Sequence, residues 1–242
     1  MSDTLTPAGV AETVTVINKP KRSPSLINQA QARALTRAEF VGLAAKKDAY
    51  APALAARDID ETAVDALLEE VGAGRDKAAE AVINTTAHRE ATAAEKTNAK
   101  KLEAGLREVQ KAAKQKYART NRIALADYLI GEKLNGSRSN LSSTSRTIIT
   151  RVVSDKLPGF TSAKVKALAA QRQTWIEAQQ TQTEAETASL NSRAELKTLL
   201  ISVTDRRIAV QLAADAEWSH ADEANAATRK EFSLPAKRPL KV

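Results

Sequence analysis

An acidic cluster with one histidine near the carboxyl terminus is the group of side chains in this sequence best suited to holding a metal. Carboxylates together with an imidazole can bind Mn, Fe or Zn. The cluster has no second histidine nearby, however, and no Glu-x-x-His pair precedes it. A simpler interpretation is that a helix ends here and Asp222 caps a short helix over about 223–232. The cluster consists of Asp215, Glu217, His220, Asp222 and Glu223.

Two glycine-containing segments match nucleotide-binding motifs only in part. Gly131 to Gly136 is followed by Ser137 and Arg138, where a phosphate-binding loop requires a lysine. Gly72-Ala73-Gly74 lacks the third glycine and the preceding strand of a dinucleotide-binding fingerprint. The first segment is better explained as a loop between helices, and the second as a place where helices bend or touch closely.

Nucleophilic catalysis needs a nucleophile, a base and a group that orients the base, and no such grouping is recognisable in the sequence. His88, the other histidine, falls among small residues of a predicted helix and is interpreted as a packed or partly exposed helix residue. The sequence therefore predicts a protein that is not an enzyme, with no catalytic residues, cofactor, metal or small-molecule substrate. A helical enzyme that uses the acidic cluster stays open as an alternative, which metal analysis of the purified protein would test.

The segment from Lys96 to Arg122 is strongly basic, with nine cationic residues against Glu103 and Glu108. On a helix, six of the cations fall within about 40° of one line, and apolar residues occupy the other side. Such a face serves solubility, contacts phosphates or binds an acidic neighbour. Non-specific nucleic-acid binding is therefore an alternative function, although aromatic residues for base stacking are scarce here. The six residues are Lys96, Lys100, Arg107, Lys111, Lys114 and Arg122.

The elements that position these residues are predicted to be helices, because the strong helix breakers are nearly absent. Neither glycine nor proline occurs from Phe160 to Leu234, and proline is absent from Ala53 to Leu157. The predicted fold is therefore all-α: an elongated helical bundle, or a hairpin of two very long helices with shorter helices added.

A first helix is predicted over about 36–57, beginning with the capping-box pattern Thr36 and Glu39 and bent at Pro52. Its expected inner stripe is Phe40, Leu43, Lys47, Tyr50 and Leu54.

The second predicted helix starts after the cap Asp60 and continues to Ile130, unless Gly72, Gly74 or Gly105 interrupts it. A loop over 131–139 and a shorter helix ending before Leu157 follow. The last long helix, about 162–214, is capped by Thr161 or Ser162. Its polar middle, 179–187, requires a narrow partner contact or projects into solvent as the tip of a hairpin.

Composition narrows the class of protein further. Of the 242 residues 43% are hydrophobic but only 3% aromatic, so the buried layer is expected to be thin and rich in alanine. The chain has 0 cysteines, which excludes disulfides and fits a reducing compartment. No signal peptide or long apolar run is evident, so we expect a cytoplasmic protein without membrane contact, with non-classical export left open. The net charge of +8 permits an acidic partner but does not identify one.

The chain is expected to divide into an amino-terminal arm over 1–27, a helical bundle over 28–214 and a carboxyl-terminal tail over 215–242. The arm contains the β-branched run Val14, Val16 and Ile17 between prolines, and is either a disordered tail or a strand that pairs with another subunit. The tail carries Trp218, Phe232 and Leu234, which are too apolar for a solvated segment. They are expected to clamp the tail against the bundle or against a neighbouring copy.

The tail carries a distinctive set of short motifs: Gln211-Leu212-Ala213-Ala214-Asp215-Ala216-Glu217-Trp218, Asn225-Ala226, Arg229, Glu231-Phe232, Leu234-Pro235 and Arg238-Pro239, with Tyr117-Ala118-Arg119 and 126–131 upstream. With these motifs the chain resembles, from about Tyr50 onward, an uncharacterised group of bacterial helical proteins. The resemblance implies an all-helical fold to which the tail belongs, and it implies no activity, cofactor or site.

Long helices with slender apolar stripes gain stability by lying beside one another and leave little room for a pocket. The sequence therefore predicts a structural or scaffolding subunit that forms homo-oligomers, in a filament or another regular assembly.

Overall fold

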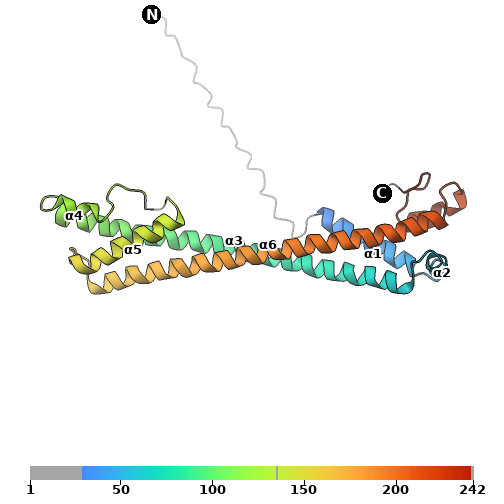
Figure 1. Cartoon of the computed structure of the whole chain (residues 1–242), viewed down its shortest axis with the longest axis horizontal. Helices are drawn as coiled ribbons and strands as arrows, with labels where there is room; N and C mark the ends of the chain where they lie inside the picture. Colours follow the sequence, from blue (N-terminus) through green and yellow to red (C-terminus); the bar gives the residue numbers. More distant parts are fainter. Residues whose placement is uncertain (1–28, 135, 241–242) are drawn as a thin grey trace, which may run out of the picture.

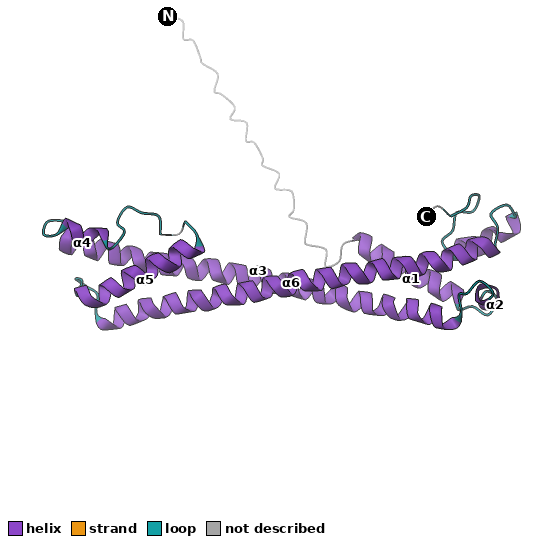
Figure 2. Cartoon of the chain, in the orientation of Figure 1, coloured by secondary structure: helices purple, strands orange, loops and turns teal. Residues whose placement is uncertain are grey.

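A computed structural model describes residues 29–134 and 136–240 of the chain. Two long helices, α3 (Glu61–Tyr117) and α6 (Ser162–Glu217), run antiparallel and cross near their middles (Figure 1). At about 1.5 Å per residue, each is roughly 85 Å long. Helices and turns account for the described residues, without a strand (Figure 2). The predicted all-α hairpin of two very long helices is confirmed.

One end of this rod, here called the tail end, holds the carboxyl end of the described chain, and α1 begins nearer the middle of the rod and runs towards it (Figure 1). The helices α1 (Gln29–Ala45), α2 (Ala51–Ala55) and α7 (Ala226–Glu231), with the short 3₁₀ helix η1 (Glu223–Asn225), gather there around the start of α3 and the end of α6 (Figure 1). Their core contains mainly aliphatic side chains and alanine, and it includes Leu35, Val41, Leu54, Leu67, Val71, Val203, Val210, Phe232 and Leu234.

The opposite end, here called the loop end, has a second and separate core. The helices α4 (Arg122–Ala126) and α5 (Arg138–Asp155) cover the end of α3 and the start of α6 (Figure 1). Buried there are Leu102, Leu106, Val109, Tyr128, Leu134, Ile148, Leu168 and Trp175. Between the two ends, α3 and α6 meet through the small cluster of Ala78, Ala81 and Leu196 and through polar side chains. This middle segment is called the waist.

The first helix differs from its prediction in extent and in the face that it buries. It begins by Gln29, so Thr36 and Glu39 lie inside the helix, and it ends at Ala45. Pro52 lies in the first turn of α2. Backbone N–H groups have no partner within the helix at this position, so the missing N–H of proline costs nothing there, and Pro52 starts a helix instead of bending one. Phe40 and Leu43 point outward, whereas Leu35, Val41 and the alanines of α1 face the core.

The second long helix is shorter than predicted, because it ends at Tyr117 and a turn separates it from α4. Its three glycines do not interrupt it. At Gly74, a Cβ atom would lie 2.7 Å from the Leu35 Cδ2 atom, so the predicted close approach of helices is confirmed there.

The predicted caps Asp60 and Thr161 accept hydrogen bonds from the backbone amides three residues later. Asp222 accepts one from the Ala224 amide and caps η1, which leads into α7, so the predicted short helix near 223–232 is confirmed. The last long helix extends three residues beyond the predicted boundary at 214, to Glu217.

Candidate functional site

An aromatic cluster fixes the carboxyl-terminal tail to its own bundle. The rings of Trp218 and Phe232 stack with centroids 5.2 Å apart. The Tyr50 ring, at the entrance to α2, meets both edge-on with centroid distances of 5.2 and 5.4 Å. Phe232 and Leu234 are buried in the tail-end core. Two arrangements were predicted for these residues, against the bundle or against a neighbouring copy. The structure has the first: the tail packs against its own bundle.

Arg229 is the polar centre of this clamp, and its side chain is 0% exposed. It donates hydrogen bonds to the backbone oxygens of Trp218, Pro235 and Arg238. It also forms an ion pair with Asp215, with an N–O distance of 2.5 Å. A buried charge needs such partners, because its transfer out of water is costly. The role of Arg229 could not be predicted from the sequence, because its partners are mostly backbone carbonyls, which no motif reveals.

The acidic cluster does not come together as a metal site. Asp215 is engaged by Arg229, Glu217 forms an ion pair with Arg57, and Asp222 caps η1. Within residues 29–134 and 136–240, no group of three or more His, Cys, Asp or Glu side chains has the arrangement needed to hold a metal ion. The prediction that the segment terminates a helix accounts for these contacts. The assembly residues predicted in the arm, Val14, Val16 and Ile17, lie outside the described residues.

The predicted basic face is present in part. Lys96, Lys100, Lys111 and Lys114 are exposed on α3 and form no ion pair with a described residue. Arg107 is exposed too, and it pairs with Glu103 one turn earlier. Arg122 belongs to α4, beyond the turn that ends α3, so its predicted place on the same line of one helix is wrong.

A shallow cationic groove between α5 and α6 was not predicted. It has a volume of about 620 Å³ and combines arginines with hydroxyl groups. The Arg172 Nε atom donates to the Ser145 hydroxyl, and neither Arg146 nor Arg172 pairs with an acidic residue in the part of the chain described. The groove is lined by Arg138, Ser139, Ser142, Ser143, Arg146, Thr147, Arg172 and Gln179.

A polar network crosses the waist and joins three helices. Arg138, at the start of α5, donates to both carboxylate oxygens of Glu95 on α3, at 2.8 and 2.7 Å. Arg138 also donates a hydrogen bond to the Gln182 side-chain oxygen on α6. The amide nitrogen of Gln182 lies 3.1 Å from the His88 Nε2 atom on α3. The polar middle of α6 therefore makes the predicted narrow partner contact and is not the tip of a hairpin. His88 is a half-buried helix residue, as predicted, but Arg138 was expected in a loop.

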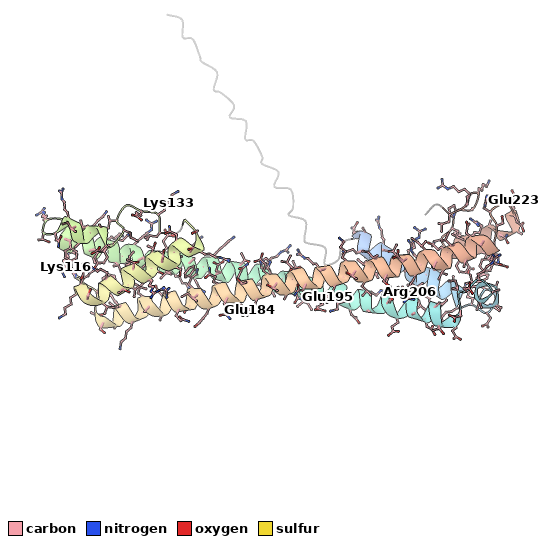
Figure 3. The ribbon with its side chains drawn as sticks, viewed as in Figure 1. Lys116, Lys133, Glu184, Glu195, Arg206 and Glu223 are labelled. Atoms are coloured by element: carbon pink, nitrogen blue, oxygen red, sulfur yellow. The ribbon has the colours of Figure 1, made fainter. Side chains whose placement is uncertain are left out.

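Large apolar side chains on the outside of the rod form the remaining surface of interest. On α1, Phe40 is 61% and Leu43 is 52% exposed. On α6, Leu190, Ile201 and Leu212 are 58%, 54% and 43% exposed, and these three are called the α6 stripe. The stripe lies on the stretch of α6 that bears the labelled Glu195 and Arg206 in Figure 3. These exposed residues could contact a partner, whereas the buried ones could not.

No helix among the described residues has the length and apolarity to cross a lipid bilayer. Comparison with protein-family models, curated proteins and solved structures gave no match to the chain. The resemblance to a group of bacterial helical proteins therefore stays a prediction, and the function has to be inferred from the geometry.

Proposed function

We propose that the chain is a non-enzymatic, rod-shaped structural subunit that associates with copies of itself, in a filament or another regular assembly. The observation that carries the proposal is the α6 stripe, together with Phe40 and Leu43 on α1. Single exposed apolar residues are common, but apolar residues repeated along one helix face are typical of interaction surfaces. We also propose a cytoplasmic location, since a chain with 0 cysteines needs no oxidising compartment.

Self-association also fits the architecture, because the buried charges of the rod are compensated inside the chain and need no partner. Among the described residues, the charged side chains that are buried belong to Glu95 and Arg229, and both have ion-pair partners inside the chain. The apolar residues on the outer faces have no equivalent cover from the described helices. Burying them between copies would gain roughly 25 cal/mol per Å² of apolar surface, before the costs of association are subtracted.

Light scattering coupled to size-exclusion chromatography, over a wide range of protein concentration, tests the proposal. We expect a mass that rises with concentration to a multiple of 26.0 kDa. Negative-stain electron microscopy of the same fractions should show rods joined in a regular way. A mass of one chain at the highest concentration would overturn the proposal.

Non-specific nucleic-acid binding is the second candidate, favoured by the four lysines of α3 that pair with no described residue and by the α5–α6 groove. Its test is the salt dependence of binding to duplex DNA. Each neutralised phosphate contributes about −0.9 to the slope of log K against log salt. Changing Lys100, Lys111 and Lys114 to Gln should therefore reduce that slope by up to roughly 3. Absence of binding at low salt would remove this candidate.

A further inference from the structure

The α6 stripe is part of a longer face with a regular spacing. Leu190, Ile201 and Leu212 are separated by 11 residues each, and four other residues, Ala194, Lys197, Asp205 and Ile208, lie between them on the same side. At 100° per residue, all seven positions fall within an arc of about 80°. The residues that α6 buries in this stretch, such as Leu196, Val203 and Val210, lie on the other side of the helix.

The order of residues on this face is nearly the same read in either direction from Ile201. A leucine stands 11 residues before it and another 11 residues after it. Seven residues away lie the apolar side chains of Ala194 and Ile208. Four residues away, the two sides differ in charge: Lys197 precedes Ile201 and Asp205 follows it.

Such an arrangement is what an antiparallel pair of identical helices requires. In a two-fold symmetric contact, residue i of one copy meets residue j of the other, and j meets i. With the symmetry axis at Ile201, Leu190 would meet Leu212 of the second copy, and Ile201 would meet its own counterpart. Lys197 would meet Asp205 of the second copy, twice, so the charges are complementary across the axis.

Lys197 and Asp205 have no such contact within one chain. They stand eight residues apart on α6, which is about 12 Å along the helix axis. Both are exposed, and neither forms an ion pair or a hydrogen bond through its side chain with another described residue. Their charges are therefore available to a partner.

A shallow groove lies beside the centre of the face. It has a volume of about 350 Å³ and is lined by Gln31 of α1 and by Lys197, Leu200, Ile201, Thr204 and Asp205 of α6. The side chain of a second Ile201 has room to enter it. An 11-residue repeat corresponds to about 3.67 residues per turn, so the two helices would stay in contact with a slight right-handed supercoil.

We propose that two copies of the chain associate through this face of α6, antiparallel and with a two-fold axis at Ile201. The inference rests on the proposed self-association and names the surface and the geometry that produce it. The contact would extend over about 33 Å, from Leu190 to Leu212.

Cysteine cross-linking tests the geometry, because the natural chain has 0 cysteines. A disulfide forms only where two Cα atoms come within about 7 Å. We expect Ile201→Cys, and the double variant Leu190→Cys with Leu212→Cys, to give covalent dimers under mild oxidation. Leu190→Cys alone should stay monomeric under denaturing conditions, because its counterpart would be at the far end of the contact. Efficient cross-linking of Leu190→Cys alone would indicate a parallel pair and overturn the proposal.

Charge reversal tests the ion pairs in solution. Lys197→Asp or Asp205→Lys alone places like charges together twice, so we expect the dissociation constant of the dimer to rise at least about tenfold. The double variant restores opposite charges, and its dissociation constant should return to within about threefold of that of the natural chain. Lys166→Asp, an equivalent change at an exposed loop-end position of α6, is the control and should leave dimerisation unchanged.

The outcomes separate this inference from the proposed function. If the natural chain is monomeric at every concentration, both fail. If it associates but the double-cysteine variant does not cross-link, or the charge reversals have no effect, self-association stands and this interface is wrong. Circular dichroism of each variant confirms that the helices are intact, and changes at exposed residues are expected to leave them so.

Discussion

Arg229 has a fully buried guanidinium that binds three backbone oxygens and one carboxylate. Its planar fork of five donors can reach separate acceptors at once, which a lysine ammonium cannot do. Removal of one member of a buried ion pair leaves the other charge uncompensated. Arg229 therefore holds the tail in place through contacts that no other residue type could reproduce.

Changing Arg229 to Ala should lower the free energy of unfolding by about 3–5 kcal/mol, because Asp215 and three carbonyl oxygens lose their partner. Urea denaturation monitored by circular dichroism measures this loss. Trypsin should also cleave at Lys230 and Lys237 sooner than in the natural chain, because the tail detaches first. Arg238→Ala is the matched control, since Arg238 contributes only its backbone oxygen to the clamp. Equal stability of the two variants would contradict this role for Arg229.

Tyr128 and Asp155 form a second contact whose strength depends on pH. The Tyr128 hydroxyl donates to an Asp155 carboxylate oxygen at 2.8 Å, and burial followed by this hydrogen bond raises the pKa of Tyr128. Burial acts to raise the pKa of Asp155 as well, but hydrogen bonds from Tyr128 and Tyr117 and the charge of Arg151 outweigh it and lower that pKa. The ionised form of Asp155 is therefore the one that stabilises the fold.

Asp155→Asn should reduce the free energy of unfolding at pH 7 by about 1.5 kcal/mol, the usual contribution of a hydrogen bond to a charged group. Because the folded-state pKa of Asp155 is lowered, its stabilisation is complete above the unfolded value of 3.8 and is lost as the pH falls through the folded value. The difference between the two proteins in urea should therefore stay constant down to about pH 4 and shrink as the pH falls from 3.8 towards about 2. A difference that does not change over this range would show that the carboxylate charge is unimportant.

At the scale of the helix, Gly72 and Gly74 show two different effects of a glycine inside a helix: it lowers helix stability, and it lets another helix pack closely. Both lie inside α3, where glycine is less favourable than alanine by about 1 kcal/mol. A Cβ atom added at Gly72 would meet nothing within 4 Å, whereas one at Gly74 would come within 2.7 Å of the Leu35 side chain. Gly74 therefore permits α1 to pack closely on α3, and Gly72 has no such function in the chain.

Gly72→Ala should raise the free energy of unfolding by about 1 kcal/mol, because alanine restricts the unfolded chain and favours the helix. Gly74→Ala should gain less than this or lose stability, because Leu35 is buried and has to move aside. Thermal unfolding of the two variants side by side gives the comparison. The interpretation of Gly74 as a packing residue is wrong if its variant gains as much as the Gly72 variant.

The two long helices could be predicted from the sequence, but the buried face of the first helix could not. The scarcity of glycine and proline and the caps Asp60 and Thr161 predicted α3 and α6. The buried face of α1 was assigned wrongly, because the predicted stripe passed through Phe40 and Leu43, whereas Leu35 and Val41 enter the core together with Ala38, Ala44 and Ala45. Where alanine forms much of the core, hydrophobicity alone does not identify the inner face.

Contacts between residues distant in the sequence were also beyond prediction. Glu95, Arg138 and Gln182 stand about 40 residues apart from one to the next, and no local pattern shows that they meet at the waist. The exposed α6 stripe was missed for another reason. The sequence placed the inner stripe of α6 correctly at residues such as Leu196, Val203 and Val210, but it did not show that the apolar residues outside this stripe stay exposed.

At the scale of the whole molecule, two apolar cores lie at opposite ends of the rod with a waist between them. Ala78, Ala81 and Leu196 are the buried apolar residues of the waist cluster, and the waist is otherwise joined by polar contacts. Local opening of a protein follows the density of buried apolar contacts. The two ends are therefore expected to open separately, although α3 and α6 run through both.

Leu102→Ala should destabilise the loop end by about 2–5 kcal/mol, because it leaves a cavity beside fully buried neighbours. Hydrogen exchange measured by mass spectrometry should then show faster exchange in α5 and in the last turns of α3, while α1 and the first turns of α3 keep their protection. Leu67→Ala in the tail-end core is the matched change and should give the reverse pattern. Faster exchange throughout the chain in both variants would mean that the polar waist couples the ends into one cooperative unit.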